Sequence, residues 1–338
     1  MAESFYSQFI LDPNFDDVIE DLNKKTIHAI EPIYASMDKT DDYSDNSNVK
    51  VEKIDNVDKW KLNSRNGQKK QEQYKLCAYD ESLVKIPSLE GNGFFISHSL
   101  ITMSEDRYVP LIYLTFNFYT RSKDVSDGNN ALKLTTKPFE FESKIDYIND
   151  RKNVLSKYTP DSSILFIDGP LIGGQITEYN MQLNAELFKR KIFPIYFVKN
   201  SDSSLITDNF PSLSGKYNSD FEWAFKILKP GERTGLFKYN DLVGNKKKIF
   251  SYVKAFATPP CRIEFDQMTY LNLRNSIDEI FDIIYYLLLA QGNPRNPQVR
   301  PIVIAEMYAR EALKVIDFDN IIHQTGITPT MNYTRFGW

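Results

Sequence analysis

The segment that decides the fold is SSILFIDGPLIGG, residues 162–174, in which a short apolar run leads into an acidic turn. The continuous apolar stretch from Ile164 to Ile167 is typical of a strand that is buried on both faces. Asp168 ends this strand, and a Gly-Pro turn follows it. Because ligands of α/β sheets bind at the carboxyl ends of strands, Asp168 is a candidate metal ligand. Asp-Gly is also a common turn dipeptide, so a purely structural role is the alternative.

The sequence on either side of this segment predicts a mixed sheet. Before it, three strand-like runs with short gaps predict an antiparallel meander. After it, strands alternate with helices, which predicts parallel pairing with helices over the sheet. The fold class expected from this pattern is α/β, a mixed β-sheet flanked by helices. The meander covers 74–80, 93–103 and 109–120; the later helices cover 176–190, 221–228, 272–290 and 301–316, and the later strands 193–199, 248–256 and 261–265.

Length and composition predict one large globular unit with short additions at its ends. The chain has 338 residues, of which 42% are hydrophobic, and this is enough to bury a substantial core. We expect a main domain over residues 71–320. An N-terminal segment, residues 1–70, reads as a helix at 14–36 and a polar loop at 38–58, and residues 321–338 read as a tail.

Several classes of protein are excluded by what the sequence lacks. The N-terminus has no basic stretch followed by an apolar one, so no secretory signal is expected. The longest apolar stretch, residues 281–290, is about half of the ~20 residues needed to cross a bilayer. We therefore expect a cytoplasmic protein without membrane contact. Cys77 and Cys261 have no adjacent Cys or His partner, which favours reduced, packed thiols over a zinc site.

The charge balance gives no global signal for nucleic-acid binding. The net charge is −4 and the pI is about 5.6, whereas phosphate-binding proteins usually carry a net basic face. Any contact with DNA must therefore be local. Short basic clusters are present, although such runs are more often solvated surface: Lys69-Lys70, Lys189-Arg190-Lys191 and Lys246-Lys247-Lys248.

Further carboxylates could join Asp168. Asp80 follows an apolar run in YKLCAYDES, so it also ends or nearly ends a strand. Two such carboxylates on neighbouring strands could share divalent cations, which is the arrangement that cleaves phosphodiesters. A predicted helix at 141–158 carries Glu142, Asp146 and Asp150 at a spacing of four, and Asp150 could supply a third ligand. A stripe of this kind is also typical of a solvated helix face.

Two basic residues are candidates for contact with a phosphate. Lys199 ends the strand FPIYFVK and, as a mobile point charge near Asp168, is suited to bind a scissile phosphate. Arg262 and Glu264 in CRIEF share one face of a strand, because side chains alternate with a period of two. That pair is compatible with either a phosphate contact or an internal salt bridge.

Taken in order, these motifs resemble the NurA nucleases, which process DNA ends. The family pattern has an Asp after a first strand, a helical carboxylate, a strand that ends in Asp-Gly, a strand that ends in Lys, an Arg-x-Glu strand and a C-terminal helix. The likeness covers about residues 77–316, and the matching segments are CAYDES (77–82), the helix around Asp150, FIDGPL (166–171), YFVKNSDSSL (196–205), CRIEF (261–265) and RPIVIAEMYARE (300–311).

The resemblance implies an RNase H-like fold and a metal-dependent deoxyribonuclease, active as a single-strand endonuclease and a 5′→3′ exonuclease with manganese, or magnesium, as cofactor. It implies metal ligation by Asp80, Asp150 and Asp168, and a homodimer docked on a HerA-type hexameric ATPase. The sequence departs from the family at Glu81, where Gly is common, and at Gln298 and Glu306, which replace a Tyr and a His. Glu306 is the candidate that takes over the role of the His.

Two other functions are compatible with the sequence. The departures from the family pattern favour a catalytically weak relative that binds DNA or a HerA-type translocase as a partner subunit. The glycines of DGPLIGG could instead cradle the phosphates of a nucleotide, although the segment lacks the Lys-Ser/Thr of a P-loop.

Overall fold

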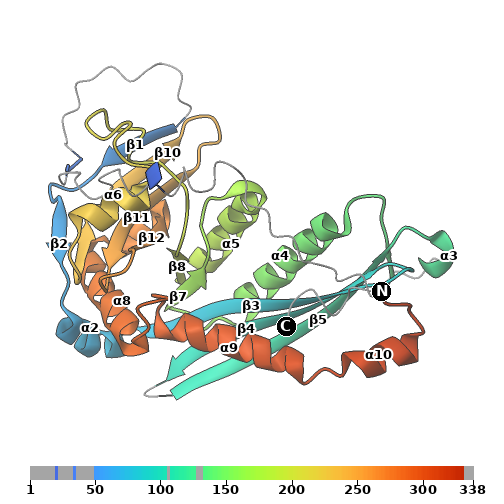
Figure 1. The fold of residues 1–338 in the computed structure, drawn as a ribbon. Coiled ribbons are helices and arrows are strands. Elements are labelled where there is room, and N and C mark those ends of the chain that lie inside the picture. The colour runs from blue at the N-terminus through green and yellow to red at the C-terminus, as the bar shows by residue number, and fades with distance from the viewer. Residues whose placement is uncertain (1–19, 22–32, 36–48, 105–106, 127–131, 331–338) are drawn as a thin grey trace, which may run out of the picture.

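The computed structural model describes residues 20–21, 33–35, 49–104, 107–126 and 132–330. Within these residues, twelve strands form one mixed sheet, with helices on both faces (Figure 1). The strand order is β1-β10-β11-β12-β8-β7-β3-β4-β5-β6, and β9 joins β2 to β11. This confirms the predicted α/β fold class.

The centre of the sheet contains the predicted meander and the predicted parallel strands. The meander strands β3 (Lys75–Pro87), β4 (Asn92–Ser104) and β5 (Arg107–Thr120) pair antiparallel. On its other edge β3 pairs parallel with β7 (Ser163–Asp168), which pairs parallel with β8 (Phe193–Val198). In the order β5-β4-β3-β7-β8 only β4 runs opposite to the others. This order and these directions are those of an RNase H-like sheet.

The remaining strands extend this central sheet at both ends. Beyond β8, the antiparallel strands are β12 (Cys261–Asp266), β11 (Lys247–Lys254), β10 (Phe237–Asp241), β1 (Val49–Lys53), β9 (Glu232–Thr234) and β2 (Lys59–Lys61). Beyond β5, β6 (Leu132–Leu134) pairs parallel. Strand β1 lies within the segment 38–58, so the prediction of a polar loop there is wrong for these residues. Their register with β10, rather than local hydrophobic periodicity, makes them a strand.

The helices lie in two layers, one on each face of the sheet (Figure 1). Helices α4 (Phe139–Tyr158) and α5 (Thr177–Lys189) cover one face, where they pack over Tyr79, Ile167 and Tyr196. Helices α8 (Ile277–Gln291) and α9 (Arg300–Lys314) cover the other. The shorter helices are α2 (Ser64–Lys70), α3 (Lys123–Ser126), α6 (Asp220–Ile227), α7 (Gln267–Leu273) and α10 (Phe318–Thr325), with 3₁₀ turns at Gln71–Gln73, Gly174–Ile176 and Arg274–Ser276.

Helix α9 approaches the sheet closely, and the sequence explains how. Pro301 stands in its first turn, where a missing N–H costs nothing. Ala305 and Ala309 face the sheet and are completely buried, so no bulky side chain holds the helix away from β3 and β4. Glu306, the next residue after Ala305, is thereby carried to the edge of this contact.

Two predicted segments fall largely outside the described residues. Most of the helix expected at 14–36 belongs to them, and so do residues 331–338 of the expected tail. Residues 321–325 of that tail belong to α10. Strands β1 and β2 of the expected N-terminal segment are hydrogen-bonded members of the sheet. In the described part of the chain, no helix combines the length and the apolar character required to span a bilayer.

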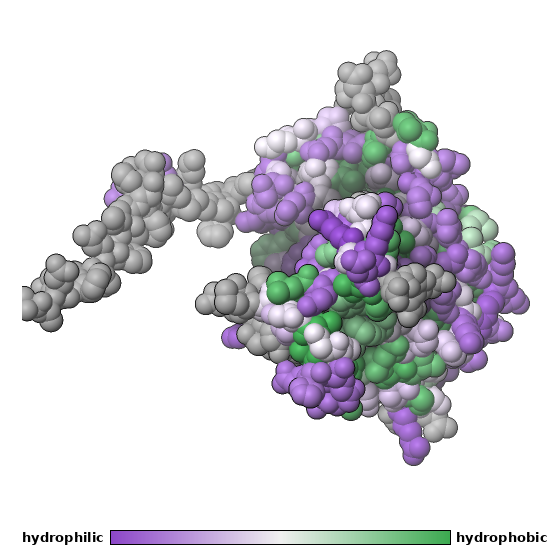
Figure 2. All heavy atoms as spheres, turned by 90° about the vertical axis from the view of Figure 1, so that its right-hand side faces the viewer, coloured by the Kyte–Doolittle hydropathy of each residue, from purple (hydrophilic) through white to green (hydrophobic). Residues whose placement is uncertain are grey.

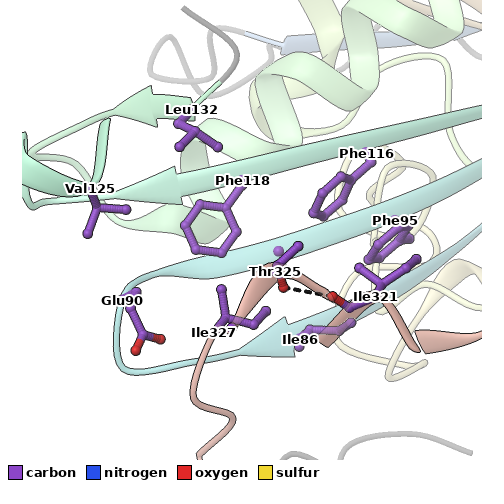
Figure 3. Close-up of a pocket in the computed structure, with 12 residues that line it drawn as sticks. Ile86, Glu90, Phe95, Phe116, Phe118, Val125, Leu132, Ile321, Thr325 and Ile327 are labelled. Atoms are coloured by element: carbon purple, nitrogen blue, oxygen red, sulfur yellow. Dashed lines mark hydrogen bonds between the residues drawn. The ribbon is translucent and has the colours of Figure 1, made fainter. Parts of the chain in front are cut away.

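The outer ends of β3, β4 and β5 enclose an apolar pocket of about 390 Å³ beneath α10. Figure 3 shows Phe95, Phe116 and Phe118 from the strands and Ile321 and Ile327 from the C-terminal segment around it. On the same side of the molecule, Figure 2 shows hydrophobic side chains gathered between hydrophilic ones. Because β3 ends here at Pro87, this pocket is remote from Asp80 and is separate from the candidate site described next.

Candidate catalytic carboxylates on β3 and β7

Asp80 and Asp168 lie side by side on neighbouring parallel strands. The register pairs Tyr79 with Ile167, and the two aspartates are the next residues on each strand. Side chains at matching positions of a parallel pair point to the same face, so both carboxylates point the same way. Asp80 is 8% exposed, whereas Asp168 is partly exposed at the strand end. The two carboxylates lie on neighbouring strands as predicted, but β3 continues to Pro87, so the prediction that Asp80 ends or nearly ends its strand is wrong.

Lys199, the residue directly after β8, completes this group. Its Nζ lies 2.9 Å from Oδ2 of Asp168, and both side chains are about one-quarter exposed, at 29% and 23%. The backbone N–H of Gly169 donates to Oδ1 of the same aspartate at 3.1 Å. The structure therefore brings Lys199 to Asp168, as the sequence predicts, with its ammonium group where it neutralises the carboxylate.

The carboxyl group of Asp80 has no cationic partner among the described residues. Burial raises the pKa of Asp80 to about 8, and the nearby charges of Glu81, Asp168 and Glu306 add to this effect. The N–H of Glu81 donates to Oδ1 of Asp80 at 2.8 Å and acts in the opposite direction. A divalent cation at this point would favour the ionised carboxylate.

Glu306 reaches the group from α9. It is close enough to Asp80 for its charge to raise the pKa of that residue. Its carboxylate also forms an ion pair with Arg310, one turn later on the same helix. The structure thus brings the predicted replacement for the family His to the two aspartates, and gives it a cationic partner that the sequence interpretation did not include.

The other face of β3 holds a cluster that sequence analysis missed. Tyr147 of α4 donates a hydrogen bond of 2.5 Å to Glu81, and the buried guanidinium of Arg151 lies within electrostatic range of the same carboxylate. Burial raises the pKa of Glu81, and Arg151 and Tyr147 oppose that rise. The missed signal was Arg151 itself, a charged residue between the core positions Ile148 and Val154 of an otherwise apolar helix stripe.

Asp150 is not brought to Asp80 and Asp168. The polar groups around Asp150 are Thr115 of β5, Lys133 of β6 and Asp146, one helical turn earlier. Strand β5 is separated from β7 by β3 and β4, so this part of α4 lies over the opposite side of the meander. The expectation that Asp150 joins the two aspartates is therefore not met, because α4 covers the face of β3 to which Tyr79 points, whereas the next residue, Asp80, points to the face that α9 covers.

Arg262 is placed inside the protein. It is 3% exposed, and its Nε donates to Oε1 of Glu264 at 2.8 Å. Lys248 donates to the same oxygen at 2.6 Å, and Glu264 is completely buried. The geometry fits the internal salt bridge and does not fit the phosphate contact, since a phosphate could not reach this guanidinium.

The loop after Asp168 is not a phosphate cradle. Three of its N–H groups already donate within the protein, those of Gly169 to Phe197 O, Leu171 to Glu264 and Gly173 to Thr177. A P-loop needs such donors free to face the ligand. The nucleotide-binding interpretation therefore has no support in this geometry.

Gln298 is completely buried just before α9, and neither polar atom of its amide has a hydrogen-bond partner among the described residues. It is thus placed in the core and not on an accessible surface of the site.

The carboxylates offer the oxygen ligands of a hard divalent cation, but two of them are paired with basic side chains. Their oxygen atoms are the ligands that Mn²⁺ and Mg²⁺ prefer, and a bound cation would oppose the burial and the nearby carboxylates that raise the pKa of Asp80. Among the described residues, no three Asp, Glu, His or Cys side chains are already arranged around one ion. Lys199 and Arg310 instead hold Asp168 and Glu306. Metal binding by Asp168 and Glu306 therefore requires Lys199 and Arg310 to leave these carboxylates.

Comparison with known proteins identifies the family to which this chain belongs. Solved structures that resemble the chain include the NurA nuclease from Sulfolobus solfataricus (11% identity, 75% of this chain and 85% of that chain, TM-score 0.44) and a NurA with manganese (9%, 72% and 88%, TM-score 0.37). An endonuclease V from Bacillus subtilis is also similar (11%, 75% and 91%, TM-score 0.36). No curated protein matches the sequence. The model of the NurA domain matches residues 87–311, about two-thirds of the chain, and the protein therefore belongs to the NurA family.

Proposed function

We propose that this protein is a metal-dependent deoxyribonuclease that processes DNA ends, as a single-strand endonuclease and a 5′→3′ exonuclease. The observation that carries the proposal is the placement of Asp80, within β3, and Asp168, at the end of β7, on one face of two parallel strands, with Lys199 beside them. Membership of the NurA family supports the same conclusion.

The residues of the site have separate tasks in this proposal. Asp80 and Asp168 hold the divalent ion, and Glu306 adds a carboxylate from α9. When bound, the ion supplies an activated water and stabilises the leaving oxygen of the phosphodiester. Lys199 exchanges its contact with Asp168 for a contact with the scissile phosphate, because an ammonium on a flexible stem can serve either anion. Asp80, which is buried, gives up its proton as the ion binds.

Manganese is the proposed ion, with magnesium as the alternative. A NurA structure with manganese and another with dAMP and manganese are among the similar proteins, and these descriptions apply to those proteins. For this chain, the support is the all-oxygen donor set, which favours hard cations. From the family resemblance we further propose a homodimer that works with a HerA-type hexameric ATPase.

The first experiment is cleavage of labelled single- and double-stranded DNA in manganese, magnesium or excess chelator. Cleavage is expected only with a divalent ion. Full-rate cleavage in chelator would exclude the metal-dependent reaction.

Asp168→Asn tests the site itself. The amide keeps the size and the turn-forming capacity of Asp168 but loses the charge that holds the ion, so single-turnover cleavage should fall by orders of magnitude. Melting temperature and DNA affinity in chelator should stay near the parental values, since one negative charge fewer does not repel phosphate. Asp150→Asn is the matched control and should cleave like the parent. Near-parental cleavage by a well-folded Asp168→Asn variant would overturn the assignment.

A catalytically weak partner subunit is the second candidate function. It is favoured by the displaced Asp150, by the ion pair between Glu306 and Arg310, and by the buried Gln298. The same cleavage assay separates the two functions, because a partner subunit binds DNA or the ATPase without releasing nucleotides in any metal.

A further inference from the structure

The loop that follows Asp168 is held by a buried charge network on the neighbouring strands. Glu264 of β12 is completely buried and uses both carboxylate oxygens. Its Oε1 accepts from Lys248 at 2.6 Å and from Arg262 at 2.8 Å, while its Oε2 accepts from the N–H of Leu171 at 2.9 Å. Among the described residues, this carboxylate therefore contacts the loop through Leu171, three positions after Asp168.

The two cations orient Glu264 and keep it ionised. Burial alone would raise the pKa of Glu264, but the charges of Lys248 and Arg262 outweigh burial and lower it. Arg262 also donates to Ser203 and to Tyr252, which fixes its own plane. A hydrogen bond from an N–H to an ionised carboxylate is stronger than one between neutral groups. Leu171 is thus anchored by a rigid, charged acceptor.

The connection from Leu171 back to Asp168 is short and stiff. Gly169 has φ +96°, a conformation that favours glycine, and its N–H donates to Phe197 O at 2.8 Å. Pro170 fixes its own φ through its ring. Asn180 of α5 donates to the carbonyls of Pro170 and Leu171, both at 3.0 Å. Because the intervening backbone has little freedom, a displacement of Leu171 is passed on to Asp168.

We propose that Glu264 is a positioning residue for Asp168, and that the buried group of Lys248, Arg262 and Glu264 sets the geometry of the candidate metal site through the N–H of Leu171. The part of this inference that concerns metal affinity rests on the proposed function. The part that concerns the loop does not.

The test compares Lys248→Met with the double variant Lys248→Met/Glu264→Met. Both lose the buried Lys248–Glu264 ion pair, and the double variant also loses the acceptor for Leu171 and the partner of Arg262, while its net charge equals that of the parent. In the double variant, hydrogen exchange at residues 169–173 should accelerate by about tenfold or more relative to Lys248→Met, the expected effect of one charge-assisted hydrogen bond. Exchange in α8 and α9 should be the same in both.

The second readout is Mn²⁺ affinity by calorimetry, without DNA. The double variant should bind Mn²⁺ about tenfold or more weakly than Lys248→Met, the loss typical of a missing partner behind a metal ligand. Equal exchange at 169–173 in the two variants would overturn the inference. Faster exchange with unchanged Mn²⁺ affinity would also overturn it, because the loop would then be ordered without positioning Asp168. If the parent itself binds no Mn²⁺, the proposed function fails, and the exchange result still decides the role of Glu264 in the loop.

Glu264→Asp covers the case in which the double variant does not fold. It keeps the charge between Lys248 and Arg262 and withdraws the carboxylate from Leu171 by one methylene. It should reproduce the faster exchange at 169–173, and parental exchange there would count against the inference.

Discussion

Asp80 and His98 are buried polar side chains that face opposite sides of the same part of the sheet. The register pairs Asp80 with Ser99 and Glu81 with His98, so the aspartate faces α9 while the histidine faces α4. The Nδ1 of His98 lies 2.7 Å from the hydroxyl of Tyr79, and its ring stacks on Tyr147. Burial raises the pKa of the Asp80 carboxyl and lowers that of the His98 imidazole, so in both cases it favours the neutral form.

His98 should make the stability of the protein depend on pH. Burial, and secondarily the charge of Arg151, lowers the pKa of His98 to about 4 from 6.5. The groups that face it are Tyr79, Tyr113, Tyr147, Arg151 and, paired with it in the register, Glu81, whose carboxylate accepts a hydrogen bond from Tyr147 and lies near the charge of Arg151. Between pH 6.5 and 4 the unfolded chain therefore binds a proton that the folded chain does not, and stability falls as the pH is lowered.

The measurement is urea unfolding at pH 7 and pH 5 for the parent and for His98→Gln. The parent should lose about 2 kcal/mol more than the variant over this interval, which follows from the two pKa values. Because the same carboxylates titrate in both proteins, the difference isolates His98. Equal losses would show that His98 is protonated in the folded protein or does not titrate in the unfolded one.

At the scale of elements, α9 controls how many carboxylates reach the site. Ala305 and Ala309 seat the helix on β3 and β4, and Glu306 then lies near Asp80 while Arg310 holds it. Glu306→Ala should lower cleavage by at least about tenfold, since even an outer partner of a metal ligand has an effect of that size. Arg310→Ala should leave cleavage at or above the parental rate, because it frees the carboxylate.

Single-turnover rates at several manganese concentrations check this pair of variants. If Glu306→Ala cleaves as fast as the parent at all of them, Glu306 does not take over the role of the family His. If Arg310→Ala is the more damaged of the two, the cation and not the carboxylate is the functional group of α9.

The elements themselves were largely predictable from the sequence, because local patterns determine them. The strand SILFID at 163–168 and the helix around 141–158 were predicted from apolar runs and helical spacing, and both are present. Strand β1 was missed because its five residues gain their hydrogen bonds from β10, which lies far along the chain. Pairing of that kind leaves no local signal.

The candidate site was predictable only in part, for a related reason. Asp168 ends an apolar strand, a position that the sequence reveals, whereas Asp80 ends only the apolar part of β3, which continues to Pro87. Which side of α4 faces the sheet was not revealed, because its acidic stripe and its buried residues alternate around the helix. The sequence also did not reveal that α4 covers the face of β3 opposite to the one from which Asp80 projects, so Asp150 was predicted at a site that α4 does not face. Arg262 was ambiguous because alternation in a strand gives the face but not the depth of burial.

At the scale of the whole molecule, the charge distribution leaves few basic side chains that could contact DNA phosphates. The net charge is −4, and members of the basic clusters are already paired: Lys70 with Glu279, Arg190 with Asp161, Lys246 with Glu178 and Lys248 with Glu264. Binding of a single strand through about three phosphates should give a slope near −2 in a plot of log affinity against log salt.

Anisotropy titrations of a labelled single strand in chelator, from low to high salt, measure this slope. Lys199→Gln should reduce its magnitude by about 0.7, the share of one phosphate contact. A flat affinity across the salt range would contradict a phosphate-based interface, and an unchanged slope in the variant would remove Lys199 from it.

The parallel pairing of β3 with β7 also has a consequence for how the protein reaches its native state. The meander of β3, β4 and β5 joins neighbours in sequence, whereas β3 meets β7 only after the chain has passed through α4. Contacts between distant segments form late, since the loop between them must first be closed. Asp80 and Asp168 come together only at that step. For the proposed manganese site, the first binding of the ion by a refolding chain should therefore report when this parallel pair closes.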